Sequence, residues 1–324
     1  MQVKAPDRAA AEHRAPPEHA ARRALTTTPG WRRAWRSRRL QGLGYAAPTA
    51  VFVAVFFLLP LLLVGQMSLS DWPLLAGDRG ANAPENYTDV TGSPLFWPAV
   101  RFTLLYTVIV TVVLLGLALL LALLVQESRP GAGFFRTVYF LPGALGLASA
   151  SLLFWGLYSP TTGPLGDILE NLALVDEPVS FLGTPTSALL STVFLVVWKF
   201  AGFYMLILLV GLQRIPHEVY EAARMDGASR AQIFRSITLP LLRPSLALSL
   251  LLCVTGSLLA FDQFFVLTKG GPDNSTVTVV QLVYREAFQR LDLGTAAALS
   301  IIVLAALLLL NVLQFRGLRR ADES

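Results

Sequence analysis

Charged residues are scarce in this sequence of 324 residues. Asp, Glu, Lys and Arg together make up 15% of it, whereas apolar residues make up 54%. A typical soluble domain has about 25% charged and about 45–50% apolar residues, so a water-soluble globule is excluded. The apolar residues also gather in runs longer than the roughly 20 residues that cross the hydrocarbon core of a bilayer as a helix. The composition therefore predicts a protein that crosses the membrane several times.

Cysteine and histidine are also rare. Cys253 is the only cysteine, so no disulfide can form within the chain. The three histidines are His13, His19 and His217, and two of them lie in the polar N-terminal segment. They do not provide the spacing of a metal site. We therefore expect no metal site and no metal-dependent enzyme.

The scarcity of lysine bears on nucleotide binding. A phosphate-binding loop requires a glycine followed by a lysine, because backbone amides surround the phosphates while the ammonium group reaches the terminal ones. The three lysines, Lys4, Lys199 and Lys269, follow valine, tryptophan and threonine. The sequence therefore has no such loop, and any ATP hydrolysis linked to this chain must take place on a partner.

The net charge of +5 comes from residues beside the apolar runs. Residues 1–43 form a basic segment with ten Lys or Arg, which ends in a Trp- and Arg-rich run at 31–39. We expect a largely disordered tail, whose end suits either an interfacial anchor or a solvated stop to membrane insertion. Lipid headgroups and membrane topology explain these basic residues, so nucleic-acid binding is not expected.

Six apolar runs predict six transmembrane helices, at about 45–67, 102–126, 138–158, 187–212, 245–268 and 295–315. The first run is too long for the hydrophobic region of a signal peptide, so we interpret it as an uncleaved span. Pro142 and Gly143 interrupt the third run, which suits either a cavity-lining break or a simple kink. The predicted fold is all-α, with a six-span membrane domain over 44–316 and a short tail at 317–324.

The distribution of positive charge predicts the orientation. With the N-terminus inside, the cytoplasmic segments carry 20 Lys or Arg and the external segments carry five. Cytoplasmic loops of membrane proteins carry an excess of these residues. Both termini are therefore predicted to lie in the cytoplasm.

The longest cytoplasmic connection, residues 213–244, is predicted to form a short helix-turn-helix outside the bilayer. Pro216 can occupy the first turn of a helix, Gly227 can end that helix in a left-handed conformation, and Ser229 can cap a second helix that runs to about Ser236. The alternative is an ordinary amphipathic linker on the membrane surface.

This connection carries a recognisable motif. Glu221-Ala222-Ala223 is followed after three residues by Gly227, and after nine more by Ile237-x-Leu239-Pro240. The pattern resembles the EAA signature of the membrane subunits of binding-protein-dependent ABC importers. Phe261-Asp262 and the run from Leu267 to Pro272 are similar to the carbohydrate-uptake branch, which includes maltose and glycerol-3-phosphate importers. The resemblance covers about residues 45–315.

The resemblance implies that the 213–244 connection forms a coupling helix that docks on an ATPase subunit. Glu221 would be an ion-pairing or capping group toward the ATPase, and Ala222 and Ala223 would form a close-contact surface. Gly227 would provide the turn, either as a contact or as a helix cap, and Asp226 would cap the turn locally.

The implied partners are a second homologous permease, a cytoplasmic ATPase dimer, an extracytoplasmic solute-binding protein, a sugar substrate and membrane lipid. The implied location is the bacterial cytoplasmic (inner) membrane. ATP and Mg²⁺ would bind to the ATPase, and this chain would bind no cofactor and have no catalytic residues.

Polar side chains in the fourth and fifth spans are candidates for a substrate pathway. A charge inside a bilayer costs about 2.5–3.5 kcal/mol on insertion scales, so Lys199 and Asp262 require a paired or aqueous position. A structural ion pair or snorkelling is the alternative to substrate contact. Sugars are bound by aromatic faces together with amides, hydroxyls and carboxylates. The candidates are Trp198, Lys199 and Tyr204 in the fourth span and Ser257, Asp262 and Gln263 in the fifth.

The sequence therefore predicts a permease subunit that moves a mono-, di- or oligosaccharide by alternating access. Two alternatives remain. A glycerol-phosphate or polyol importer of the same architecture would require a more cationic cavity, for which Lys199 is the intramembrane candidate. A membrane-embedded enzyme or a secondary transporter would require ionisable residues deep in several spans or internal repeats.

Overall fold

The computed structural model describes residues 42–43, 45–126, 131–172 and 179–322, with side chains as far as Gly317. The predicted basic tail at 1–43 lies almost entirely outside these residues. The described chain is helical, apart from connecting segments and isolated β-bridges at Ser70–Ala81 and Pro73–Asp292. The all-α prediction is confirmed. The chain divides into two compact units between Leu61 and Leu62.

The described part of the first unit consists of the beginning of one apolar helix. This helix runs from Tyr45 to Met67, the same bounds as the predicted first span, and passes into the second unit. It includes the π-helical turn η2 (Ala54–Leu58) and α2 (Leu59–Met67). Its length of 23 residues is enough to cross a bilayer.

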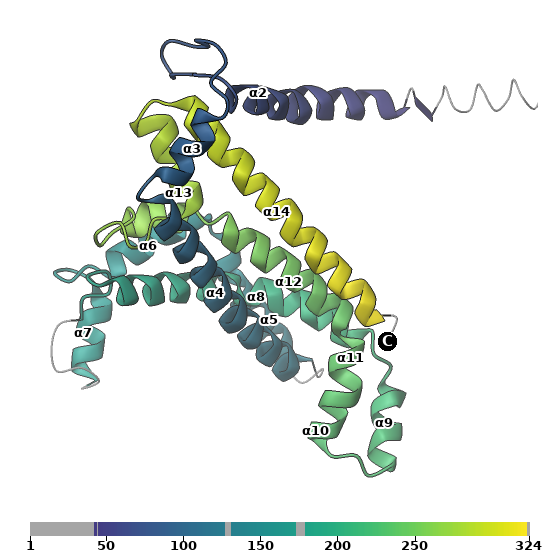
Figure 1. Ribbon diagram of the computed structural model, residues 1–324. Coiled ribbons are helices and arrows are strands. Elements are labelled where there is room, and N and C mark those ends of the chain that lie inside the picture. The colour runs from purple at the N-terminus through teal and green to yellow at the C-terminus, as the bar shows by residue number, and fades with distance from the viewer. Residues whose placement is uncertain (1–41, 44, 127–130, 173–178, 323–324) are drawn as a thin grey trace, which may run out of the picture. The chain divides into compact units, whose positions relative to one another are not determined.

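The second unit contains the remaining helices (Figure 1). They are α3 (Glu85–Gly92), α4 (Phe96–Val125), α5 (Ala132–Phe140), η3 (Leu141–Ala144), α6 (Leu147–Leu157), α7 (Pro164–Asn171), α8 (Pro185–Gln213), α9 (His217–Met225), α10 (Arg230–Ile233), η4 (Phe234–Thr238), α11 (Leu239–Leu241), α12 (Arg243–Leu258), η5 (Phe264–Thr268), α13 (Val279–Tyr284), η6 (Arg285–Gln289) and α14 (Leu293–Asp322).

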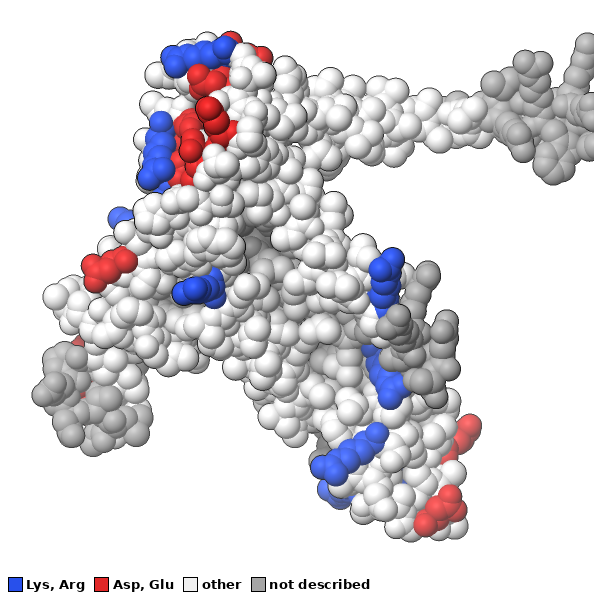
Figure 2. Space-filling model, in the orientation of Figure 1, with Lys and Arg blue, Asp and Glu red and all other residues white. Residues whose placement is uncertain are grey.

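Within the described residues, four helices are long and apolar enough to cross a membrane, and two bent helix pairs raise the number to as many as six. The four single helices are Tyr45–Met67, α4, α8 and Leu293–Gly317 of α14. Figure 2 shows charged side chains gathered around α3 and around α9 to α11, and few over the helices between them. This distribution fits helices embedded in a membrane.

Two of the predicted spans are not continuous helices. The third prediction, 138–158, is bent by 94° between Ala132–Ala144 and Leu147–Leu157. The break follows Pro142, which has no N–H to donate to the preceding turn. The fifth prediction, 245–268, is also interrupted, because α12 ends at Leu258 and the chain is not helical at 259–261 before it continues into η5. The sixth helix instead continues beyond its predicted end, through Asp322.

The helix α8 lies at the centre of the second unit. It contacts α4, α5, α6 and α12, and 61% of its most apolar 18-residue stretch is buried. In Figure 1 it lies among α4, α5 and α12, while α14 runs alongside α12. An apolar helix with this much burial indicates that α8 is the core around which the other spans pack.

One face of α8 holds the bend of the third span. Lys199 is 4% exposed, and its ammonium group donates hydrogen bonds to the carbonyl oxygens of Gly143 (3.3 Å) and Leu145. One turn along α8, a Cβ at Gly202 would lie 2.0 Å from the carbonyl oxygen of Tyr139. α8 therefore contacts the backbone at the end of α5 directly, and it supplies a donor to carbonyls that the break leaves without helical partners.

Two polar side chains, Asn86 of α3 and Glu286 of η6, are buried in the part of the second unit that contains these helices. The side chain of Asn86 donates to the carbonyl oxygens of Ser68 (3.1 Å) and Ser70 (2.9 Å). Glu286 in η6 is 4% exposed and pairs with Arg290 at 3.2 Å. Burial raises the pKa of the Glu286 carboxyl, and the Arg290 cation opposes this shift. Because the Glu286 carboxyl group has little contact with water, its ionised form destabilises the folded state.

We expect Gly202→Ala to destabilise the fold by about 1–3 kcal/mol, because the new methyl group meets a backbone oxygen that has no freedom to move. The measurement is the temperature at which half of the detergent-solubilised protein is lost in size-exclusion chromatography. Gly116→Ala in α4 is the control, because nothing lies within 4 Å of its added Cβ. Equal melting of the two variants would contradict the close packing of α8 on α5.

We expect stability to depend on Glu286 in a pH-dependent way. A carboxyl group with a raised pKa in the folded state favours folding when it is protonated, so its contribution is lost as the pH rises from about 4.3 through the raised value. Glu286→Gln should therefore be more stable than the wild type at neutral pH, with a flatter pH profile of the melting temperature. Glu85→Gln, at an exposed position of α3, should leave the profile unchanged.

Candidate functional site

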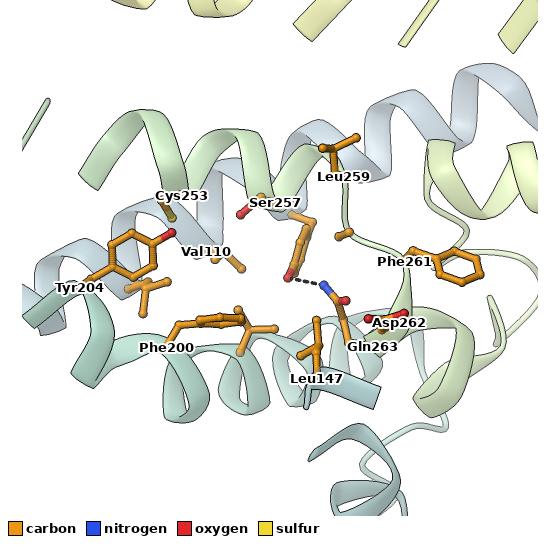
Figure 3. Close-up of a pocket in the computed structure, with 15 residues that line it drawn as sticks. Val110, Leu147, Phe200, Tyr204, Cys253, Ser257, Leu259, Phe261, Asp262 and Gln263 are labelled. Carbon is orange, nitrogen blue, oxygen red and sulfur yellow. Dashed lines mark hydrogen bonds between the residues drawn. The ribbon is translucent and has the colours of Figure 1, made fainter. Parts of the chain in front are cut away.

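A cavity of about 370 Å³ lies among the central helices of the second unit (Figure 3). This volume is in the range of small-molecule sites. Four of the six predicted pathway residues line it: Tyr204 from α8, Ser257 from α12, and Asp262 and Gln263 from the segment after α12. The other lining residues are Tyr106, Val110, Leu114, Leu147, Val196, Phe200, Cys253, Gly256, Leu259, Ala260 and Phe261.

The break after α12 brings the segment at 260–263 to the cavity. Helical hydrogen bonding ends at Leu258, and the carbonyl oxygen of Ala260 accepts a hydrogen bond from the Thr278 hydroxyl at 2.8 Å. The break therefore leaves that buried carbonyl paired, as the interior of a membrane protein requires. Ala260, Phe261, Asp262 and Gln263, which follow one another in sequence, all line the cavity as a result.

Gln263 is a half-satisfied amide in the cavity wall. It is 3% exposed, and its Nε2 donates to the hydroxyl of Tyr106 at 3.0 Å. Within the described part of the chain, its Oε1 has no hydrogen-bond partner. Tyr106 is itself 1% exposed and packs edge-on against Phe264, with ring centroids 4.9 Å apart. The amide is therefore held from one side, and its oxygen is buried without a partner.

Tyr106 was missed by sequence reasoning. It lies in the long apolar run of α4, in which a tyrosine gives no signal beyond a hydroxyl group that requires a partner when buried. The pairing with Gln263 joins residues 157 positions apart in sequence, and no local pattern indicates it.

The other polar residues of the cavity lie on α8 and α12. The hydroxyl of Tyr204 points toward Cys253, and Ser257 lies one turn beyond Cys253 on α12 (Figure 3). The thiol of Cys253 donates to the Thr111 hydroxyl at 3.7 Å. Within the described residues, no group of three or more His, Cys, Asp or Glu side chains is placed to hold a metal ion.

Trp198 and Lys199 are not among the residues that line the cavity. Trp198 packs against Phe154, with ring centroids 5.1 Å apart. The ammonium group of Lys199 bonds to the Gly143 and Leu145 carbonyls and lies 4.9 Å from the Phe200 ring centroid. The structure therefore places Lys199 at the bend of the third span, not in a pair with Asp262.

The predicted helix-turn-helix is present and projects from one end of the second unit (Figure 1). Pro216 occupies the N-cap of α9, and Gly227 follows the helix with a φ of +76°. The N–H of Gly227 bonds to the Arg224 carbonyl, and that of Ala228 bonds to the Ala223 carbonyl, both at 3.0 Å. This is a Schellman C-cap, which requires the left-handed conformation that glycine adopts readily.

The second helix of this hairpin extends beyond its predicted end near Ser236 and runs from Arg230 to Leu241. Ser229 caps it together with Gln232, whose Oε1 accepts from the Ser229 N–H at 2.8 Å. The regular α-helix α10 ends at Ile233, and the helix continues through the π-helical turn η4 and α11. The cap was therefore predicted correctly, and the helix ends later than predicted.

The residues predicted to contact an ATPase lie in α9 and in the turn that follows it. Glu221 and Ala222 are exposed, and Ala223 is half-buried. Glu221 pairs with His217 at 3.0 Å, although both side chains are more than half exposed, so this pair adds little stability. Asp226 is the C-cap residue of α9, and its N–H bonds to the Ala222 carbonyl. Met225 is 88% exposed, which leaves an apolar side chain in solvent beside the motif.

Proteins of known class resemble this chain over most of its length. A Thermococcus litoralis trehalose/maltose transport system permease is 33% identical over 276 residues, which cover 85% of this chain and 92% of the relative. A Streptococcus mutans multiple sugar-binding transport system permease is 32% identical over 266 residues, which cover 82% and 91%.

A solved structure has the same fold. A chain in the crystal structure of a bacterial ABC transporter involved in the import of the acidic polysaccharide alginate superimposes with a TM-score of 0.78 at 24% identity. The match covers 89% of this chain and 99% of that chain. The model of one family, described as the inner membrane component of binding-protein-dependent transport systems, matches residues 90–321. The chain therefore belongs to this family of transport permeases.

Proposed function

We propose that the chain is the membrane-spanning permease subunit of an ATP-driven carbohydrate importer. Both termini lie in the cytoplasm, and the hairpin that contains α9 docks on a cytoplasmic ATPase dimer that binds ATP and Mg²⁺. A second homologous permease completes the membrane pathway, and an extracytoplasmic solute-binding protein delivers the sugar. The observation that carries this proposal is the exposed hairpin, whose first helix and turn contain the Glu221–Gly227 motif.

The hairpin is joined to two of the helices that line the cavity. α8 leads into α9 through Arg214 and Ile215, and Ile215 is 9% exposed. On the other side, η4 and α11 lead into α12. The hydroxyls of Tyr220 in α9 and Thr238 in η4 are 3.4 Å apart and link the two arms. A displacement of α9 is therefore passed to α8 and α12, which carry Tyr204 and Ser257 in the cavity wall.

This connection supports alternating access as the mechanism. Closure of the ATPase dimer moves α9, and the two helices attached to the hairpin rearrange around the cavity. The ATPase can shift the equilibrium between two arrangements of the spans only if its closed form binds one arrangement better than the other. This chain contributes the docking helix and the cavity wall, and the ATPase partner supplies the energy.

The cavity supports a carbohydrate as the substrate. It combines aromatic rings from Tyr204 and Phe200 with the polar groups of Ser257, Asp262 and Gln263. Sugars have both apolar faces and hydroxyl groups, and a site for them requires both kinds of surface. Two relatives of similar length are permeases of trehalose/maltose and multiple sugar transport systems.

The glycerol-phosphate alternative is not favoured. An anionic substrate requires cationic groups, and Lys199 was the intramembrane candidate. Its ammonium group bonds to backbone carbonyls at the bend of the third span. Among the described residues that line the cavity there is no Lys, Arg or His.

We expect Gly227→Pro to abolish carbohydrate uptake without preventing membrane insertion. Proline holds φ near −65° and has no N–H, so it cannot adopt the φ of +76° or donate to the Arg224 carbonyl. Gly227→Asn is the matched control, because asparagine tolerates the left-handed conformation and should retain uptake. The measurements are uptake of radiolabelled sugar and copurification of the ATPase.

The same assays test the charge of Glu221 in α9. Glu221→Lys should abolish both copurification of the ATPase and uptake, whereas Glu170→Lys in α7 should leave copurification unchanged. Wild-type uptake in both Gly227→Pro and Glu221→Lys would refute the coupling role of the hairpin.

A further inference from the structure

One hydrogen-bond acceptor in the cavity wall, the side-chain oxygen of Gln263, has no donor in the described chain. Gln263 Nε2 is used by Tyr106, whereas Gln263 Oε1 is buried without a partner in the described chain. A buried acceptor without a donor is costly, so the wall is incomplete until something donates to this oxygen. The carboxylate of Asp262, next to Gln263, is a second acceptor on the same side of the cavity (Figure 3).

The charge that the described lining residues bring to the cavity is negative. Asp262 is the only Asp, Glu, Lys, Arg or His among them. Most of the remaining wall is apolar, including Val110, Leu114, Leu147 and Val196. The Asp262 side chain is itself exposed, and a charge beside low-dielectric walls focuses its field into the adjoining cavity. One carboxylate therefore suffices to raise the local concentration of cations and lower that of anions.

We propose that Asp262 and Gln263 make the cavity a charge filter that accepts uncharged or cationic sugars and rejects carboxylated or phosphorylated ones. Rotation of the buried Gln263 side chain toward the cavity lets a hydroxyl group of the substrate donate to its Oε1 and complete the wall. A carboxylate or phosphate group brings further acceptors and a like charge toward Asp262. This selectivity rests on the proposed function, because it assumes that a carbohydrate occupies the cavity, and it concerns the part of the pathway that this chain contributes.

The charge filter can be measured without knowing the natural substrate. Leu147 lines the cavity from α6 and points toward Gln263 (Figure 3), so Leu147→Cys in a Cys253→Ser background places one thiol there. The full-length chain, solubilised with its copurifying subunits, is treated with two methanethiosulfonate reagents of similar size, one trimethylammonium and one sulfonate. Each labelling rate is divided by the rate with a free thiol in solution.

We expect the cationic reagent to react faster than the anionic one by roughly tenfold after this correction. Asp262→Asn should bring the ratio close to one, and Asp262→Glu, which keeps the charge, should restore it. Asp273→Asn is the matched control, because Asp273 is exposed and lies outside the cavity lining, and its φ of +50° suits asparagine. A ratio that favours the anionic reagent, or one that Asp262→Asn leaves unchanged, would overturn the charge filter.

The acceptor role of Gln263 is tested by protection of the same thiol. Glucose, glucosamine and glucuronate share one ring and differ in charge. Glucose and glucosamine should slow the labelling of Leu147→Cys by an uncharged methanethiosulfonate, and glucuronate should not. Gln263→Leu should remove the protection but keep the charge ratio. Protection by glucuronate equal to that by glucose, or by none of the three, would overturn the assignment.

These results are separable from a failure of the proposed function. The labelling ratio requires neither ATP nor transport, so it still reports the charge of the cavity if radiolabelled sugar uptake is absent. Conversely, sugar uptake together with equal labelling by the two charged reagents would leave the importer function intact and overturn only the filter.

Discussion

The architecture of this permease depends on the supply of hydrogen-bond donors to backbone carbonyls where two membrane helices break. A lipid interior offers no water to such carbonyls, so an interrupted span is stable only where the protein itself pairs them. Lys199 does this for Gly143 and Leu145 in the third span, and Thr278 does it for Ala260 in the fifth. Both breaks border the cavity, because Leu147 follows the first and Ala260 lies within the second. The cavity is therefore a product of the interruptions.

This arrangement gives the intramembrane lysine a structural role. A buried cation is costly unless other groups compensate its lost hydration. Lys199 has two backbone oxygens as acceptors and an adjacent aromatic ring, and it thereby connects α8 to the bend between η3 and α6. Among the described residues that line the cavity, the charged one is Asp262. Two intramembrane charges that look equivalent in sequence thus have different surroundings.

Much of the fold could be predicted from the sequence, because length and apolar composition alone determine where helices cross a bilayer. The first span agreed at both ends, and the turn at Gly227 with the cap at Ser229 followed from local backbone chemistry. The bend after Pro142 was only one of two interpretations, since a proline in a span produces either a break or a kink. What decides between them is a donor from α8, 56 residues away in sequence from Gly143. Tyr106 was missed for the same reason, because its partner Gln263 is distant in sequence. The roles of the predicted pathway and coupling residues remain predictions.

The uninterrupted length of α8 has a mechanical consequence. Its 29 residues extend over about 43 Å, from the capping box at Thr184 to the connection with α9. The only proline within it stands at the first helical position, so no weak joint divides it. Such a rod cannot tilt at one membrane surface without tilting at the other. The cavity would then open toward one compartment and close toward the other in a single rotation of α8. No separate coupling between two gates would be required.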